Sequence, residues 1–484
     1  MPLNDSPQDR LDAVRHLLTR HGQEHLLAFY DSLDTGQQAS LLEQILAIDF
    51  EKLGILIEEH VRQAREYDLP TNLEPAPYYP REPYGAYDAS EFRKIGEDCI
   101  RSAKVAAFTV AGGQGTRLGW NGPKGTYPAT VVTGKPIFRC LAEQILAVER
   151  KYDVEIPWYI MTSPQNDSQT REFFQDNNCF GLVRSNIFMF PQGVMPCLDA
   201  NTGKLLLAGH HEIAVNPDGH GGSLRALFTS GAIEDMRARE IEHISYFQID
   251  NPLVKAIDPL FIGLHVGAPD SSGQISSKMV VKSGPEEKVG VFCRDGGAGG
   301  KTRVIEYTDL PPELTHQRDE DGNLRFNAGS IAIHLLGVGF VEKINSDQDR
   351  FGLPWHRALK VVPHVEIDTG KIVEPSEANA VKLETFVFDA IPLAEKSIVY
   401  ETGRVEEFAP IKNLKGIDSP VTSHQIQSDR NGSWLESHGV KVPRDDQGHV
   451  QARIEISPLT ALEPADLATI DLPKEIKIGN NINL

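Results

Sequence analysis

The sequence predicts an α/β fold in which helices cover both faces of a central sheet. Short apolar runs recur at residues 105–110, 158–161, 187–190 and 244–249. Segments with helical spacing of apolar residues separate them, at 137–151, 168–175 and 224–239. A glycine-rich loop follows the first apolar run, as expected where a buried parallel strand ends. Strands that alternate with helices in this way are typical of βαβ units.

Two regions flank this alternation. Before residue 100, apolar residues recur at helical spacing, and a proline-dense stretch at 70–83 then forms an extended connector. After about residue 275 the chain is richer in strand-like segments, such as 279–281 and 304–307. After about residue 405 it consists mainly of loops, prolines and short strands. These changes predict three parts: an N-terminal helical region with its connector at 1–100, the α/β domain at 101–400, and a small C-terminal domain at 401–484.

Composition and charge restrict the kinds of partner. The chain has 484 residues, of which 40% are hydrophobic and 24% charged, and its formal net charge is −20. Nucleic-acid binding is not expected, because it requires basic patches that neutralise phosphates. A membrane span is not expected either, since no run of about 18 uncharged apolar residues occurs.

The sequence also favours a location in the cytoplasm. The first ten residues lack the basic and then apolar pattern of a secretory signal. Five dispersed cysteines without a C-x-x-C pair indicate free thiols in a reducing compartment. We found no signal of an oligomeric state.

The most informative segment is the glycine-rich loop at 110–119, which is followed by Pro123, Lys124 and Gly125. Its glycines expose backbone N–H groups that can cradle phosphates. Arg117 and Lys124 add cations, which a polyanionic substrate would need on so acidic a protein. The loop fails the dinucleotide fingerprint, because Leu118 stands where the third glycine should be, and it fails the Walker A pattern, because Pro123 precedes Lys124.

The loop instead matches the G-G-x-G-T-R-L…P-K signature of sugar-nucleotide pyrophosphorylases. From about residue 100 to about residue 460 the chain resembles eukaryotic-type UDP-N-acetylhexosamine pyrophosphorylases and, less closely, UDP-glucose pyrophosphorylases. Further motifs that carry the resemblance, in the same order, include 156–163, 217–222, 250–255, 326–329, 386–389, 410–413 and 455–458.

The resemblance implies a Rossmann-like nucleotidyltransferase fold (GT-A-like) with a central mixed sheet. It implies a Mg²⁺-dependent uridylyltransferase whose substrates are UTP and a sugar 1-phosphate, with N-acetylglucosamine or N-acetylgalactosamine as the sugar. The sugar phosphate is already an anion, so the reaction needs alignment and charge neutralisation rather than a general base.

The resemblance also assigns roles to individual residues. Arg117, Lys124 and Lys412 match the catalytic cations. The nucleotide-binding positions are Ala111, Gly112, Gly113, Gly115, Gln192, Gly219 and Lys382. Positions of the sugar pocket are His220, Gly290, Glu306, Tyr307 and Asn327. Asp250 matches the carboxylate that holds Mg²⁺. Without the surrounding motifs, Asp250 also fits a turn residue and Lys382 a solvated lysine beside a strand.

One position departs from the N-acetylhexosamine pattern. That group normally has Gly-Asn-Gly-Gly where this chain has Gly219-His220-Gly221-Gly222, and a Gly-His-Gly loop is usual in UDP-glucose enzymes. The alternatives are therefore a UDP-glucose or broad-specificity pyrophosphorylase and, in another class, a non-catalytic UDP-sugar-binding protein.

Overall fold

The computed structural model describes residues 7–64, 69–70, 72–83, 85–296, 299–346 and 352–484. Contacts within the chain divide it into two compact units. Unit 1 contains residues 1–69, 193–222 and 354–386, and unit 2 contains residues 70–192, 223–353 and 387–484. These units do not coincide with the three ranges predicted from the sequence, because unit 1 is assembled from three separate stretches.

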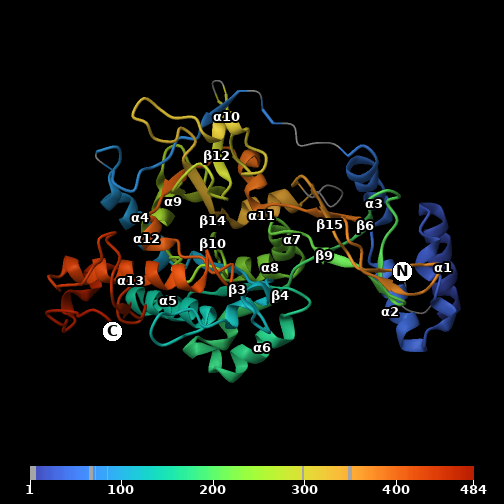
Figure 1. Ribbon diagram of the computed structural model, residues 1–484, viewed down its shortest axis with the longest axis horizontal. Coiled ribbons are helices and arrows are strands. Elements are labelled where there is room, and N and C mark those ends of the chain that lie inside the picture. Colours follow the sequence, from blue (N-terminus) through green and yellow to red (C-terminus); the bar gives the residue numbers. More distant parts are fainter. Residues whose placement is uncertain (1–6, 65–68, 71, 84, 297–298, 347–351) are drawn as a thin grey trace. The chain divides into compact units, whose positions relative to one another are not determined.

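Unit 2 is built on a mixed sheet, which holds ten strands among the described residues (Figure 1). The path of its neighbouring strands is β1 (Leu73–Pro75), β12 (Val291–Asp295), β14 (Ala328–Gly337), β10 (His243–Gln248), β2 (Val105–Val110), β3 (Trp158–Thr162) and β4 (Ile187–Pro191). β11 (Ile275–Val281), β13 (Thr302–Ile305) and β19 (Val399–Glu401) pair beside this path. Strands β10, β2, β3 and β4 are parallel, whereas β14 runs antiparallel to β10.

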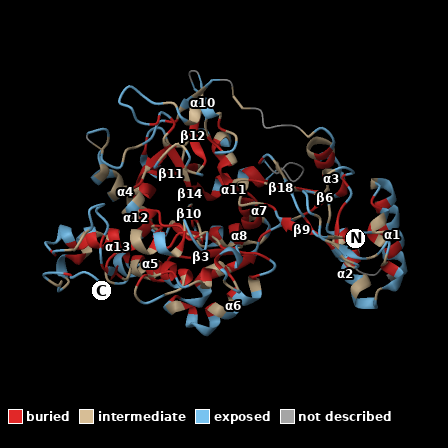
Figure 2. Ribbon diagram, in the orientation of Figure 1, coloured by how far each residue is buried: buried red, intermediate tan, exposed pale blue. Residues whose placement is uncertain are grey.

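Helices surround this sheet. They are α4 (Ala89–Arg101), α5 (Ile137–Tyr152), α6 (Asp167–Asp176), α7 (Gly222–Thr229), α8 (Ala232–Ala238), α9 (Pro259–Gly267), α10 (Pro312–Thr315), α11 (Val338–Asn345), α12 (Arg404–Glu407) and α13 (Pro420–Ser437). Figure 2 shows that the sheet is mostly buried, and β2 and β3 are buried at nearly every residue. The predicted class, a Rossmann-like α/β fold around a mixed sheet, is confirmed.

Unit 1 combines helices with short strands. Its elements are α1 (Pro7–His21), α2 (Thr35–Leu46), α3 (Phe50–Ile57), β5 (Val194–Pro196), β6 (Leu198–Asp199), β7 (Leu207–Gly209), β8 (Glu212–Ile213), β9 (Val215–Pro217), β15 (His356–Lys360), β16 (His364–Val365), β17 (Ile372–Val373) and β18 (Ala380–Glu384). One hydrophobic core joins its helices to its strands, because Leu18, Leu41 and Leu53 pack in the same cluster as Leu198 and Leu383.

Two sequence-based predictions of elements were wrong. The segment 224–239 is two helices rather than one, because Gly231 adopts a left-handed conformation (φ 82°) between α7 and α8. Helix α13, of 18 residues, lies where we expected loops and short strands. Its buried side consists largely of polar residues such as Gln427 and Asn431, so apolar periodicity gave no signal. Beyond it, the pair β20 (Arg453–Glu455) and β21 (Asn481–Asn483) completes the C-terminal part.

None of the helices in the described part of the chain is long and apolar enough to cross a membrane.

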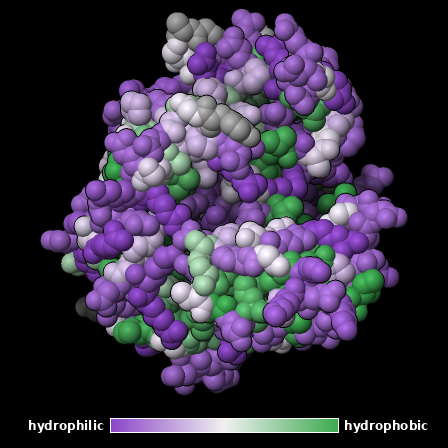
Figure 3. Space-filling model, turned by 90° about the vertical axis from the view of Figure 1, so that its left-hand side faces the viewer, coloured by the Kyte–Doolittle hydropathy of each residue, from purple (hydrophilic) through white to green (hydrophobic). Residues whose placement is uncertain are grey.

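The face on the side of α13 is mostly hydrophilic, with apolar side chains gathered in its lower half (Figure 3).

Candidate active site

The glycine-rich loop and Asp250 leave the sheet of unit 2 at the same edge. β2 and β10 are parallel and in register up to the pair Val110 and Gln248, so the segments that follow both strands emerge side by side. The Ile249 N–H donates to the Val110 carbonyl at 3.1 Å. Ligands of open α/β sheets bind at this carboxyl edge.

The loop folds back on itself after β2. The Gly115 N–H donates to the Gly122 carbonyl at 2.9 Å, and the Lys124 N–H donates to the Gly113 carbonyl at 3.0 Å. These two hydrogen bonds hold the backbone of Lys124 against the glycine-rich loop. Gly115 itself has no room for a side chain, because a Cβ there would lie 2.6 Å from Cβ of Trp120.

Two side chains from neighbouring strands support the loop. Gln192 follows β4 and is buried, and a Cβ on Gly112 would lie only 2.4 Å from its Oε1. Gly112 is therefore needed for the carboxamide of Gln192 to pack against the loop. Asn166, fully buried, donates from Nδ2 to the carbonyl of Ala111 at 3.0 Å. Sequence reasoning missed Asn166; its position five residues after the end of the predicted strand 158–161 was the available signal.

A cluster of charged side chains gathers beside this loop. The Nζ atom of Lys412 lies 3.8 Å from Oδ2 of Asp250 and 3.6 Å from Oδ2 of Asp418. Burial lowers the pKa of Lys124; the carboxylate of Asp250 opposes this change, whereas the cations of Lys412 and Arg117 add to it. The structure therefore brings Arg117, Lys124, Asp250 and Lys412 into one electrostatic neighbourhood.

Asp418 is a member of this cluster that the sequence did not indicate. Burial raises the pKa of its carboxyl group, and the Lys412 ammonium opposes this effect. The negative charges of Asp250 and Glu287 raise the pKa further. Asp418 also fixes the lysine backbone, because its carbonyl accepts the Lys412 N–H at 2.6 Å.

Buried hydrogen bonds fasten the segments that carry Asp250 and Lys412. The Ile411 N–H donates to the carbonyl of Asp250 at 2.8 Å. The buried Asn251 side chain donates to the Glu407 carbonyl at 2.6 Å and accepts the Ala409 N–H at 3.1 Å. Two segments distant in sequence thus meet at the edge of the sheet.

A buried ion cluster lies directly behind this junction. Nζ of Lys278 donates to the Asp258 carboxylate at 2.7 Å and to the Glu407 carboxylate at 2.6 Å. Lys278 and Glu407 are both fully buried. Removal of one partner from such a cluster leaves an uncompensated buried charge, so the cluster constrains both segments strongly.

Four of the predicted sugar-pocket residues lie together at one end of the β12–β13–β14 part of the sheet. Gly290 and Glu306 flank the Val291–Ile305 pair of the hairpin, and Asn327 precedes β14. The amide of Asn327 forms a side-chain hydrogen bond with the Tyr78 hydroxyl. Tyr307 is 43% exposed.

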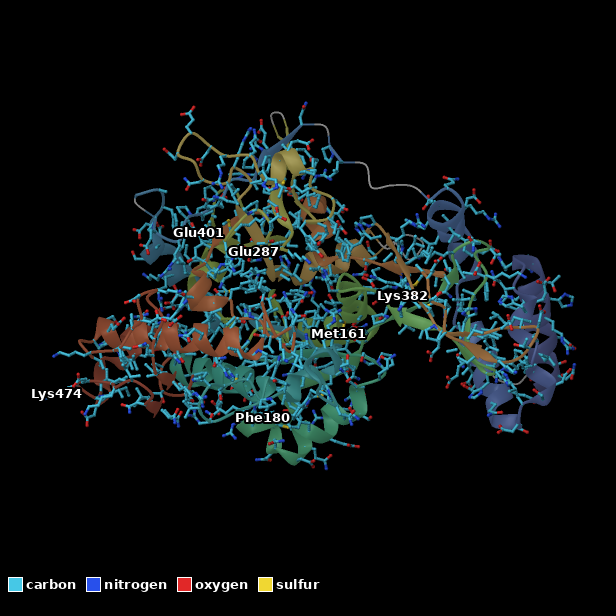
Figure 4. All side chains as sticks on the ribbon, in the orientation of Figure 1. Met161, Phe180, Glu287, Lys382, Glu401 and Lys474 are labelled. Atoms are coloured by element: carbon cyan, nitrogen blue, oxygen red, sulfur yellow. The ribbon has the colours of Figure 1, made fainter. Side chains whose placement is uncertain are left out.

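Glu287 lies three residues before Gly290 in the chain; its charge acts on Asp418, and it forms a 2.8 Å ion pair with Arg404. It is labelled in Figure 4.

The remaining three predicted residues belong to unit 1. Lys382 lies in β18, opposite Ala358 of β15, and is labelled in Figure 4. A Cβ on Gly219 (φ 84°) would lie 2.3 Å from the Thr385 carbonyl oxygen, so this glycine permits a close approach of two backbones. The imidazole of His220 stacks on Phe386 at 5.2 Å between ring centroids.

His220 is a neutral imidazole near pH 7. Burial lowers its pKa to about 4, and the charge of His356 adds to this effect. His356 stacks on the same Phe386 ring, at 4.4 Å between ring centroids. A neutral imidazole can offer shape and hydrogen bonding to a site, but no positive charge.

The fold, the glycine-rich loop at the carboxyl edge of the sheet and the adjoining charges together are those of a nucleotidyltransferase. The chain belongs to the UTP–glucose-1-phosphate uridylyltransferase family, whose model matches residues 84–438. This finding confirms the predicted enzyme class, a uridylyltransferase.

Similar proteins come from distant organisms. The chain is 35% identical over 480 residues to the human UDP-N-acetylhexosamine pyrophosphorylase-like protein 1, covering 93% of this chain and 92% of that protein. It is 33% identical over 446 residues to the UDP-N-acetylglucosamine pyrophosphorylase of Saccharomyces cerevisiae, covering 89% and 92%. The crystal structure of the Trypanosoma brucei uridine diphosphate N-acetylglucosamine pyrophosphorylase in complex with inhibitor superposes with a TM-score of 0.80 at 25% identity, covering 99% of each chain.

Proposed function

We propose that this chain forms a UDP-N-acetylhexosamine and pyrophosphate from UTP and an N-acetylhexosamine 1-phosphate. The observation that carries the proposal is the convergence of Arg117, Lys124, Asp250 and Lys412 beside a phosphate-cradling loop at the carboxyl edge of the sheet. The substrate class follows from the names of relatives that align along nearly the whole chain.

In the proposed reaction a phosphate oxygen of the sugar 1-phosphate attacks the α-phosphorus of UTP. The new P–O bond forms while the bond to the β-phosphate breaks, and its electron pair leaves with pyrophosphate. The attacking oxygen is already anionic, so no side chain has to remove a proton. The protein must align two polyanions and neutralise the charge that builds up between them.

We assign these tasks to particular side chains. Lys124 and Arg117 hold the phosphates of UTP from the glycine-rich loop, whose residues 111–115 supply backbone N–H groups. Lys412 receives the sugar phosphate. The buried carboxamide of Gln192 reads the uracil base. Its close packing on Gly112 holds this carboxamide in a fixed position.

Asp250 is the proposed ligand of Mg²⁺. Among the described residues, no three or more His, Cys, Asp or Glu side chains are grouped so that they could hold a metal ion. A single carboxylate still fits Mg²⁺, which in such sites is bound through one or two carboxylates together with substrate phosphates and water. When bound there, the ion would neutralise charge on the phosphates.

The remaining assignments follow from the motif matches. Gly290, Glu306, Tyr307 and Asn327 hold the sugar. From unit 1, we assign Gly219 to the uracil, Lys382 to the phosphates and His220 to the sugar end. A cytoplasmic location remains a prediction, and it is supported by five free cysteines.

The test is pyrophosphate release from UTP and Mg²⁺ with four sugar 1-phosphates: those of N-acetylglucosamine, N-acetylgalactosamine, glucose and galactose. We expect preference for the N-acetylated sugars. Preference for glucose or galactose would show that His220 reports the specificity of a UDP-glucose type of enzyme. Binding of UDP-sugar without release from any substrate would identify a non-catalytic binding protein.

A further inference from the structure

A loop at residues 282–290 of unit 2 touches several of the residues that we assign to the sugar. It leads from β11 to β12, and its last residue is Gly290. A Cβ on Gly290 would lie 3.5 Å from Oε1 of Glu306. At the other end of the loop, the Lys282 N–H donates to the carbonyl of Asn327 at 2.9 Å. The 282–290 loop therefore adjoins the proposed sugar pocket at both of its ends.

The middle of this loop is held by a charged side chain from another part of unit 2. Nη2 of Arg404, at the start of α12, lies 2.8 Å from Oε1 and 2.9 Å from Oε2 of Glu287. The same nitrogen donates to the carbonyl of Val281 at 3.1 Å. Glu287 in turn accepts the N–H of Ser283 at 2.7 Å and its hydroxyl at 3.0 Å. The side chains of Arg404 and Glu287 are 31% and 16% exposed, so water screens their ion pair only in part.

The other ion pair of the loop is weaker. Nε2 of His316 lies 3.3 Å from Oε1 of Glu286, but these side chains are 57% and 86% exposed. Such a pair contributes little, and the imidazole carries a charge only when it is protonated. Nζ of Lys282 donates to the carbonyl of Pro285 at 3.1 Å, which is a contact within the loop. We therefore regard Arg404 as the main tether of the middle of the loop.

The helix that carries Arg404 is fixed to the interior of unit 2. Its last residue, Glu407, is fully buried and accepts hydrogen bonds from Nζ of Lys278 at 2.6 Å and from the hydroxyl of Thr402 at 2.7 Å. The N–H of Phe408 donates to the carbonyl of Arg404 at 2.9 Å. Because α12 is anchored in this way, Arg404 ties the loop to a rigid support.

The same support leads to the lysine that we assign to the sugar phosphate. Phe408 directly follows α12 and is buried. The centre of its ring lies 5.5 Å from Cζ of Arg404 and 5.8 Å from Nζ of Lys412. Both distances are within the range of cation–π contacts. One ring thus contacts the cation that holds the loop and the cation that lies 3.8 Å from Asp250.

We propose that Arg404 is a positioning residue that holds the 282–290 loop in a fixed relation to Lys412, so that the sugar and its phosphate are bound together. It acts through Glu287 on the loop and through Phe408 on the lysine. This inference rests on the proposed function, because that function places the sugar beside Gly290 and the sugar phosphate on Lys412.

A positioning role has a consequence that a purely structural role lacks. UTP is assigned to the glycine-rich loop with Arg117 and Lys124, which follow β2 rather than β11. A UDP-sugar also brings its sugar to the 282–290 loop. Loss of the Arg404–Glu287 pair should therefore weaken the binding of UDP-sugar and spare that of UTP. A loss of stability alone would not distinguish the two ligands.

Titration calorimetry tests this difference with two ligands in the presence of Mg²⁺. They are UTP and UDP-N-acetylglucosamine, or UDP-glucose if the wild type prefers glucose 1-phosphate. We expect Arg404→Met and Glu287→Gln each to weaken UDP-sugar binding about tenfold, because each removes one partner of a charged pair and frees the loop. The affinity for UTP should not change.

The double variant Arg404→Met with Glu287→Gln sharpens the test. Because the two side chains act as one pair, the double change should weaken UDP-sugar binding no more than either single change does. It also leaves neither charge without its partner, which favours folding. Arg444→Met is the matched control: its guanidinium has a similar exposure and pairs with Glu436 of α13, and its loss should leave both affinities unchanged. Thermal unfolding identifies any variant that fails to fold.

The proposal is overturned if the folded variants bind UDP-sugar as the wild type does, if their affinity for UTP falls equally, or if the effects of the two single changes add. Failure of the proposed function appears in the wild type instead, as the absence of pyrophosphate release from any sugar 1-phosphate. Because calorimetry needs no turnover, a wild type that binds UDP-sugar without turnover would still test Arg404. A wild type that binds no UDP-sugar would overturn both.

Discussion

At the residue scale, Lys124 lies among charges of both signs. Its ammonium is partly buried, close to two other cations and one carboxylate, and its pKa is lowered by burial first and by Lys412 and Arg117 next. Asp250 resists this change. The phosphates of UTP would raise the pKa of Lys124, as Asp250 does. Bound UTP should therefore favour the protonated lysine, and the protonated lysine should favour the binding of UTP.

This arrangement predicts a pH dependence. The protonated lysine is the active form, and a lowered pKa means that it is lost at a lower pH than the ordinary 10.5. The kcat/KM for UTP, which reports the free enzyme, should therefore fall at lower pH than kcat, which reports the complex. Lys124→Arg is the control, because a guanidinium keeps its proton throughout this range. An alkaline limb that is the same in Lys124→Arg would assign it to another group, such as the uracil.

The site residues that the sequence could identify are those in dense local motifs. The glycines, Arg117 and Lys124 stand within fifteen residues of one another, so their spacing was readable. Asn166 contacts Ala111 from 55 residues away in the sequence. Asp418 lies six residues after Lys412 and contacts it through both its carboxylate and its carbonyl. Both contacts depend on how the backbone folds in three dimensions, which no local pattern shows.

At the element scale, α4 and α9 pack closely because each contributes a glycine that lies against the backbone of the other helix. A Cβ on Gly96 would lie 1.8 Å from the Pro259 carbonyl oxygen, and one on Gly263 would lie 1.6 Å from the Phe92 carbonyl oxygen. Helix α9 begins at Asp258, whose side chain caps it by accepting two N–H groups. The crossing therefore fixes the segment that leads from Asp250 to the helix.

We expect Gly96→Ala to lower the free energy of unfolding by about 1–3 kcal/mol, because the helices must move apart. Gly54→Ala in α3 is the matched control: a Cβ at this exposed helical glycine would meet no atom within 4 Å. It should raise stability by about 0.5–1 kcal/mol, because alanine favours a helix. Chemical denaturation of both variants measures the two effects, and equal effects would contradict the close crossing.

Element prediction succeeded where burial is apolar. It failed at α13, where burial is polar, and at 224–239, where Gly231 divides the segment into two helices. The runs at 105–110 and 158–161 are buried strands, as expected. Helix α13 instead buries Ser423, Asn431 and other polar groups, whose partners lie elsewhere in the chain. Its signals were the Ser419 cap and Pro420 at the first turn, which we did not use.

At the scale of the whole molecule, unit 1 is discontinuous in sequence. Its hydrophobic core joins residues of α1–α3 to Leu205, Val381 and others from two later stretches. The sequence predicted the N-terminal helices but assigned them to a separate N-terminal region. A pattern of apolar residues shows that one face of a helix is buried, but it does not show which segment covers that face. The α/β core of unit 2 was predictable, since its strands and helices follow each other along the chain.

A truncation tests this description. Removal of residues 1–64 would expose buried side chains such as Leu198, Leu205 and Leu383. We expect the remaining chain to aggregate or to lose the cooperative unfolding of the full-length protein, as monitored by light scattering and thermal denaturation. A truncated chain that keeps the oligomeric state of the full-length protein and unfolds like it would show that the helices form a separate domain.

The central claim is that Asp250 and its neighbouring cations form the centre of uridylyl transfer. Its most direct test is the Mg²⁺ dependence of pyrophosphate release by Asp250→Asn, with Asp418→Asn as the control carboxylate beside the same lysine. We predict that Asp250→Asn folds as the wild type does but loses about 10²–10³ in turnover, as expected when a group that stabilises transition-state charge is removed. Asp418→Asn should lose much less. Turnover of Asp250→Asn within about tenfold of the wild type, at the same Mg²⁺ concentration, would contradict the account.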